Sequence, residues 1–173
     1  MAIAKKLGTQ YEAVRAAIRT KTLKLQLNDA EFELKVRIPV KREMEELTNK
    51  IANPSKEKTE KIYKNLAAPL KKTLAESDKE FIDALNKSDE LNVKLLDDDV
   101  VVNGTSVRQI AHMNAVWQTQ VESYFALLIT PTGEPVTESF DEIADEFPEE
   151  MIREIIKKID EAIRPNYKDT KKN

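Results

Sequence analysis

Residues 105–131 read TSVRQIAHMNAVWQTQVESYFALLITP, and this stretch decides the fold. Charged residues make up 34% of the whole chain, yet Glu122 is the only one between Arg108 and Glu134. A stretch with so little charge belongs in a protein interior. Its apolar side chains recur every three or four residues, which is the spacing of one helix face: Val107, Ile110, Met113, Trp117, Val121, Tyr124 and Leu128. This face widens near its end with Phe125, Leu127 and Ile129.

The ends of this segment set the limits of the predicted helix. Ser106 and Gln109 form a capping-box pattern, and Pro131 stops the helix. We therefore predict a helix over about 106–129 at the centre of the core. A membrane span needs roughly 20 predominantly apolar residues, and this segment contains too many Gln, Asn, Ser and Thr residues for that. The alternative is that the C-terminal half of the helix is a partner-binding surface.

Length and composition limit what the chain can be. Its 173 residues fit one domain, so we predict a single globular domain over 1–167 and a disordered basic tail over 168–173. There are no cysteines, which excludes disulfides, thiolate metal sites and a Cys nucleophile, and favours a reducing cytoplasm. The N-terminal residues lack an apolar region of signal-peptide length, so we do not expect export.

Charge and glycine content argue against nucleotide and nucleic-acid binding. The 28 basic and 31 acidic residues leave a net charge of -3, with both signs spread along the chain. The chain has 3 glycines, and neither GxGxxG nor the P-loop pattern GxxxxGKS/T occurs. We therefore expect no nucleic-acid partner and no glycine-rich phosphate site.

The N-terminal quarter changes from helical to strand periodicity. Helical spacing after Thr9 predicts a short helix to about residue 20. Apolar and polar residues then alternate over 23–27 and over 32–38, which predicts a β-hairpin with its turn at 28–31. The apolar face of the hairpin must pack on another element, most simply the central helix.

The middle of the chain reads as helices followed by a second hairpin. We predict a helix over 41–52, and two helices within 55–87, because Pro69 should kink or break the segment and Ser77 begins a new capping box. Residues 91–102 read as a short hairpin with the acidic triplet 97–99 at its turn. The two hairpins could pair into one small sheet.

The C-terminal part is a loop followed by two helices. Residues 132–137 read as the loop, and Ser139 with Glu142 forms a capping box for a short acidic helix. Pro148 begins a last helix, which Arg164 and Pro165 end and whose inner face is Ile152, Ile155, Ile156, Ile159 and Ile163. The predicted fold class is mainly α (α+β): a helical domain around one central apolar helix, with one or two small β-hairpins.

No group of residues predicts catalysis, so we expect neither an enzyme nor a cofactor. The single histidine, His112, has no evident catalytic partner, which indicates a structural or surface residue. The triplet 97–99 lacks the spacing of a calcium loop, so a turn is expected there and no metal site. The eight acids between Glu134 and Glu150 are explained mostly by two helix starts, with an acidic face for a basic partner as the alternative. Of the function classes considered, a protein that acts by binding other proteins remains.

The order of these parts resembles the tail assembly chaperones of long-tailed bacteriophages. The resemblance lies in three segments, separated by a Lys/Glu-rich middle and an acidic lead: LKLQLNDAEFELKVRIP (23–39), VVVNGTSVRQIAHMNAVWQTQVESYFALLI (100–129) and FPEEMIREIIKKIDEAIRPNY (147–167). It covers about 23–167. The family has no catalytic signature to match, so no site residue is transferred from it.

The resemblance implies a function and partners. Proteins of this kind coat the helical tape-measure protein in the host cytoplasm before the tail tube assembles, and they are absent from the finished virion. They often have a longer form made by ribosomal frameshifting, and the terminal Lys172-Asn173 is compatible with a slippery AAA AAC codon pair. Tail tube subunits, this longer form and open-ended self-association are further candidate interactions.

Such a chaperone needs an exposed apolar strip for an amphipathic helix. The candidate partner-binding residues are the wide end of the central helix and a thin stripe in the charged middle: Tyr124, Phe125, Leu128, Tyr63, Leu66 and Leu70. The alternative function is a head-to-tail connector or tail-completion adaptor that stays in the virion as a closed ring.

Overall fold

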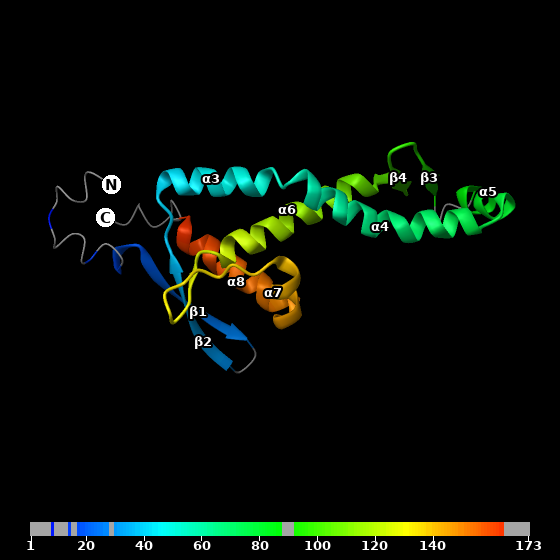
Figure 1. The fold of residues 1–173 in the computed structure, drawn as a ribbon. Coiled ribbons are helices and arrows are strands. Elements are labelled where there is room, and N and C mark those ends of the chain that lie inside the picture. Colours follow the sequence, from blue (N-terminus) through cyan, green and yellow to red (C-terminus); the bar gives the residue numbers. More distant parts are fainter. Residues whose placement is uncertain (1–7, 9–13, 15–16, 28–29, 88–91, 165–173) are drawn as a thin grey trace, which may run out of the picture. The chain divides into compact units, whose positions relative to one another are not determined.

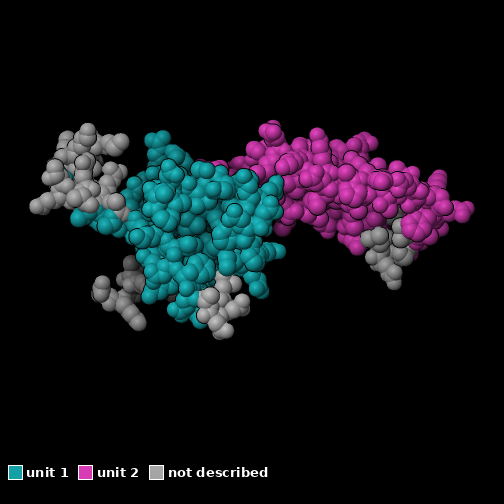
Figure 2. Space-filling view, turned by 60° about the horizontal axis from the view of Figure 1, so that its bottom comes forward, with its two compact units in different colours: residues 1–48, 120–173 teal, residues 49–119 magenta. Residues whose placement is uncertain are grey.

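The computed structural model describes residues 8, 14, 17–27, 30–87 and 92–164 of the chain (Figure 1). The described residues are mainly helical, with two small antiparallel sheets, so the predicted α+β class is confirmed. They group into two compact units: unit 1 contains residues 1–48 and 120–173, and unit 2 contains residues 49–119 (Figure 2). The single domain over 1–167 stays a prediction, because two compact units can belong to one folding domain. The predicted tail lies outside the described residues, as does most of the predicted first helix.

The sheet of unit 1 begins with the predicted hairpin. Strands β1 (Thr20–Leu27) and β2 (Ala30–Arg37) pair antiparallel, with Leu23 opposite Leu34 and Leu25 opposite Phe32. Leu23 and Leu25 are buried and the intervening Lys24 is exposed, as the alternating pattern requires. The hairpin prediction is therefore confirmed in its strands, but Ala30 and Glu31, which were predicted to lie in the turn, belong to β2.

A third strand, β6 (Leu128–Ile129), pairs with β2 on the side away from β1. The sequence predicted that these two residues end the central helix, and that prediction is wrong. The helix, α6 (Val107–Phe125), stops earlier, and the backbone N–H of Leu127 turns back to the carbonyl of Tyr124 at 3.0 Å. The apolar run therefore changes from helix to strand, because the edge of β2 offers it backbone hydrogen bonds.

Two helices end the described part of the chain. Helix α7 (Phe140–Glu146) starts with the predicted capping box of Ser139 and Glu142, and α8 (Glu149–Ile163) follows it (Figure 1). All five isoleucines of the predicted inner face of α8 are buried. Helix α8 packs against β1, although the sequence had pointed to the central helix as the partner of the hairpin. A helix with five buried isoleucines provides more apolar area for the hairpin.

Helices α3 (Lys41–Ala52), α4 (Lys56–Glu76) and α5 (Lys79–Lys87) match the predicted pattern. Pro69 lies inside α4, however, and the break comes at residues 77–78 instead. The predicted capping box at Ser77 is also wrong, because Ser77 ends α4 and the carboxylate of Asp78 accepts the backbone N–H of Phe81 at 2.8 Å. An Asp at this position caps a helix as well as a Ser does.

Unit 2 also contains the second predicted hairpin. Strands β3 (Val93–Leu95) and β4 (Val100–Val102) pair, and β5 (Thr105–Ser106) extends them to three strands. The expectation that the two hairpins join in one sheet is wrong, because each is completed by its own third strand. The core here consists of Tyr63, Ala67, Val100, Val107 and Ala111.

In the first half of helix α6, the buried residues are not the ones that were predicted. Ile110 and Met113 are 37% and 63% exposed, whereas Ala111 and Ala115 are fully buried. The two alanines are four residues apart and so lie on one face, where small side chains allow close packing. The prediction that Ile110 and Met113 lie on the inner face of these turns is therefore wrong. In the second half, Val121, Tyr124 and Phe125 are buried, which agrees with the core interpretation of this end and not with the alternative of an exposed partner-binding surface. That the whole chain is organised around this helix stays a prediction.

Candidate functional site

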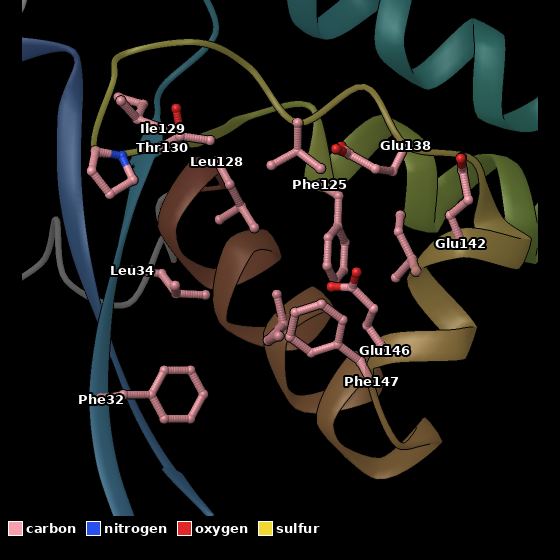
Figure 3. Close-up of a pocket in the computed structure, with 14 residues that line it drawn as sticks. Phe32, Leu34, Phe125, Leu128, Ile129, Thr130, Glu138, Glu142, Glu146 and Phe147 are labelled. Atoms are coloured by element: carbon pink, nitrogen blue, oxygen red, sulfur yellow. The ribbon is translucent and has the colours of Figure 1, made fainter.

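Unit 1 contains an open apolar pocket with a volume of about 320 Å³ (Figure 3). Strand β2 forms one wall with Phe32 and Leu34. The other walls come from the end of α6, strand β6, the following loop, α7 and α8, with these apolar residues: Phe125, Leu128, Ile129, Pro131, Val136, Ile143, Phe147 and Ile155. The pocket size is that of sites that take up a large apolar group.

Local sequence explains why these side chains face one cavity. Phe32 and Leu34 are two residues apart on β2, so they project from the same face of the sheet. Both are only half-buried, because no side chain fills the space between them and α7. The hairpin therefore offers apolar surface that the fold does not use completely.

An aromatic pair forms the inner part of the pocket. The rings of Phe125 and Phe147 meet edge to face, with centroids 5.7 Å apart and an interplanar angle of 71°. Phe125 is 2% exposed, and Phe147, the residue that ends α7, is half-buried. Edge-to-face pairs of this kind hold each other in place. The pocket therefore has one wall that is made of two aromatic rings in contact with each other.

Three carboxylates also line the pocket: Glu138, Glu142 and Glu146, here called the glutamate row. Glu142 accepts hydrogen bonds from the side chain of Ser139 at 2.7 Å and from its backbone N–H at 2.8 Å. These bonds hold the pKa of Glu142 below its ordinary value, so this carboxylate is ionised at neutral pH. Glu138 accepts the backbone N–H of Thr137 at 2.8 Å.

The glutamate row has no cationic partner within the described residues. The chain supplies eight Asp and Glu residues and no Lys or Arg between Thr130 and Ile152. The arginines at the base of the hairpin, Arg19 and Arg37, bind Glu43 instead, at 2.6 and 2.7 Å. The rim of the pocket therefore carries a negative charge that no cation of the described residues compensates.

The structure places the predicted residues at the end of α6 in the interior. Tyr124, Phe125 and Leu128 are all buried, so the prediction that they form an exposed strip is wrong. Tyr124 does not line the pocket and donates its hydroxyl to Asp160 at 2.6 Å, and burial raises its pKa above the ordinary 10.0. Phe125 and Leu128 do line the pocket, because β2 and the last two helices cover the end of α6.

The second predicted group is not an exposed strip either. Tyr63 is buried in the core of unit 2, its hydroxyl donates to the carbonyl of Asp98 at 3.2 Å, and Arg108 covers its ring. Leu66 and Leu70 are half-buried against the same core. The physical reason is that the second hairpin and the first turns of α6 pack on this stripe. These three residues form part of a core.

Sequence reasoning missed the part of the pocket that comes from distant segments. Phe32, Leu34 and Phe147 were read only as positions within a strand and before a helix. One signal was present: Glu138, Glu142 and Glu146 repeat every four residues with Ile143 and Phe147 beside them, which indicates an acidic edge next to an apolar one.

The residues considered above for catalysis and metal binding lie on the surface or take part in the fold. His112 is exposed. Asp99 is 8% exposed and accepts hydrogen bonds from the backbone N–H groups of Val100 at 2.8 Å and Arg108 at 3.1 Å, and from the hydroxyl of Ser106. Burial raises the pKa of Asp99, but these bonds outweigh it and leave the pKa below the ordinary 3.8. In the described ranges, no three His, Asp or Glu residues come together as a metal site.

Two further observations bear on the class of protein. Among the helices that the structure describes, none combines the length and the apolar character needed to cross a membrane. Comparisons of the chain with models of protein families, with curated proteins and with solved structures give no match.

Proposed function

We propose that this protein is a non-catalytic tail assembly chaperone of a long-tailed bacteriophage. It binds and solubilises the tape-measure protein in the host cytoplasm during tail assembly. The observation that carries the proposal is the apolar pocket of unit 1, which has an ordered aromatic wall and no side chain that fills it. The order of sequence segments, which resembles that family, supplies the identity of the client.

The pocket suits one large apolar side chain of a client helix. Amphipathic helices bind grooves through anchors spaced three or four residues apart, and such anchors carry most of the binding energy. A volume of about 320 Å³ accepts a Leu, Met or Phe anchor, with Phe32, Leu34 and Phe147 around it. The client-binding residues proposed are therefore these three together with Phe125 and Leu128.

One pocket of this size binds one anchor weakly, and the client is long. Tape-measure proteins offer repeated apolar stripes, so many copies of the chaperone on one client reach high occupancy through avidity. Open-ended side-by-side association of the copies follows from the same arrangement. A frameshifted longer form and the tail tube subunits are the further partners of this proposal.

Capture from cells tests the proposal. An N-terminally tagged chain is expressed with its native neighbouring genes, and the captured proteins are identified by peptide and intact-mass spectrometry. Wild type should recover a large helical tape-measure protein. Leu34→Asp should lose it, because it places a charge on the wall of the pocket, and Met113→Asp is the matched control on a surface outside the pocket.

Folding and the rival function are checked in the same experiment. Circular dichroism should show that Leu34→Asp keeps its helices, and Val136→Asp, on the loop wall, is the second variant if it does not. Recovery of finished-particle proteins alone, together with a closed ring by mass, would contradict the proposal and favour a connector or adaptor that stays in the virion.

A further inference from the structure

We infer that the pocket selects a cationic amphipathic helix: an apolar anchor with Lys or Arg about one turn away on the same face. The inference rests on the proposed function of the pocket as a client site and adds the chemical class of the client segment. The apolar cavity binds the anchor, and the glutamate row favours a positively charged residue beside that anchor.

The geometry of the glutamate row matches a helix that lies along α7. Glu142 and Glu146 both belong to α7 and are four residues apart, which is about 6 Å along a helix axis. Residues three or four apart on a client helix have a similar spacing. A Lys or Arg one turn before or after the anchor therefore reaches a carboxylate of the row while the anchor occupies the cavity.

The carboxylates are available for such a partner. Glu138, Glu142 and Glu146 are exposed, and none of them makes a salt bridge within the described part of the chain. The bonds from Ser139 fix the position of Glu142 without neutralising its charge. An approaching cation therefore gains an attraction and displaces no existing ion pair.

The same charges exclude other occupants. Phosphate groups of nucleic acids or anionic lipids are repelled by three carboxylates on the rim, and so is an acidic peptide. A purely apolar segment gains only the cavity and still desolvates part of the rim. A helix with cationic neighbours beside its anchor gains from both features.

Two synthetic peptides of about 20 residues test the inference, a length at which an isolated helix begins to be populated. The cationic peptide has a Leu stripe with Lys one turn on either side of each anchor, and the neutral peptide has Gln in place of each Lys. Fluorescence anisotropy against the full chain measures both affinities. At low salt the cationic peptide should bind about tenfold more tightly, and about 0.5 M salt should remove most of this difference.

Charge-removing variants locate the effect. The double variant Glu142→Gln/Glu146→Gln should weaken binding of the cationic peptide about three- to tenfold and leave the neutral peptide unchanged. Glutamine also serves in a capping box, so Glu142→Gln keeps the start of α7. The single variant Glu146→Gln has Asp145→Asn as its matched control. Asp145→Asn removes the same charge from the same helix outside the pocket lining, so it should weaken binding of the cationic peptide less.

The outcomes separate this inference from the proposed function. If both peptides bind equally well and Leu34→Asp abolishes both, the client site stands and the charge selectivity is overturned. If Leu34→Asp leaves the cationic peptide bound, the pocket is not the site and the inference fails, while tape-measure capture decides the function separately. Self-association that Leu34→Asp abolishes would assign the pocket to a second copy and also overturn the inference.

Discussion

The two units use aromatic rings and carboxylates in different ways. In unit 2 the guanidinium of Arg108 lies 4.0 Å from the centre of the Tyr63 ring and also pairs with Glu60, and Asp99 receives three hydrogen bonds from its own surroundings. In unit 1 the aromatic rings surround a cavity, and the carboxylates beside it have no cation among the described residues. The groups around Arg108 and Asp99 are therefore paired within unit 2, whereas the pocket of unit 1 has open apolar surface and carboxylates that make no ion pair among the described residues.

This difference distinguishes residues that stabilise the fold from residues that are available for binding. A satisfied buried carboxylate contributes to folding, because its removal leaves several donors unpaired. A half-buried Phe or Leu beside a cavity stabilises the fold less than a fully buried one does. Its remaining exposed area would contribute to the free energy of binding when a partner covers it. Substitutions in unit 2 should therefore change stability, and substitutions around the pocket should change binding.

The largest expected effect is on Asp99 in unit 2. Asp99→Ala removes the acceptor for Val100, Ser106 and Arg108, so the free energy of unfolding should fall by about 2–4 kcal/mol in urea titrations. Asp97→Ala, at an exposed turn position, is the control and should change it by less than about 0.5 kcal/mol. Equal effects of the two variants would show that the hydrogen bonds to Asp99 do not stabilise unit 2.

The second prediction concerns the pocket of unit 1, where a larger side chain should affect binding more than stability. Leu34→Trp places a larger side chain into the cavity of about 320 Å³, so client recovery should fall about tenfold while the urea midpoint changes little. Ile110→Trp, on an exposed part of α6, is the matched control and should leave recovery unchanged. A Leu34→Trp protein that keeps full client binding would show that the cavity is not used.

How much was predictable from sequence differs between these two regions. The hairpin, the five isoleucines of α8 and the capping box of α7 are local patterns, and the structure contains all of them. The pocket is not local, because it joins β2 to residues about a hundred positions later along the chain. Periodicity identified Phe125 and Leu128 as apolar, but only the packing of β2, α7 and α8 shows that they form a wall and not a surface.

The errors within α6 have the same origin. Its first turns bury Ala111 and Ala115 and expose Met113, because the choice between two helix faces depends on which neighbours pack closely. Its last turns give way to β6, because β2 has a free edge. A single sequence contains neither fact. The stripe of Tyr63, Leu66 and Leu70 was recognised as apolar, but its cover comes from the second hairpin.

Acid titration gives a third way to compare the units. The folded pKa of Asp99 lies below the ordinary 3.8, so its contribution to stability is complete above about pH 4 and is lost as the pH falls through the folded pKa. Stability measured between pH 5 and pH 2 should therefore fall less steeply for Asp99→Asn than for wild type. An identical slope in both proteins would show that other carboxylates dominate the acid transition.

In unit 1, the pair of Tyr124 and Asp160 tests a partly buried polar contact. Tyr124→Phe removes a hydrogen bond of 2.6 Å and should lower the free energy of unfolding by about 1 kcal/mol, since Arg164 still binds Asp160 at 3.0 Å. The folded pKa of Tyr124 is raised above 10.0, so its contribution is present below that pH and is lost as the pH rises further. Thermal melts at pH 7 and pH 11 should show the alkaline loss in wild type but a smaller one in the variant.

The smallest expected effect concerns Ser123 on α6, the residue before Tyr124. Its hydroxyl oxygen is buried and has no hydrogen-bond partner among the described residues. Ser123→Ala removes this unsatisfied group and improves helix propensity, so the free energy of unfolding should rise by up to about 1 kcal/mol. Thr119→Ala, at a second buried polar position of the same helix, provides the comparison by urea titration. A clear loss of stability in Ser123→Ala would mean that the hydroxyl has a partner such as an ordered water, and unit 1 would then satisfy its buried polar groups as fully as unit 2 does.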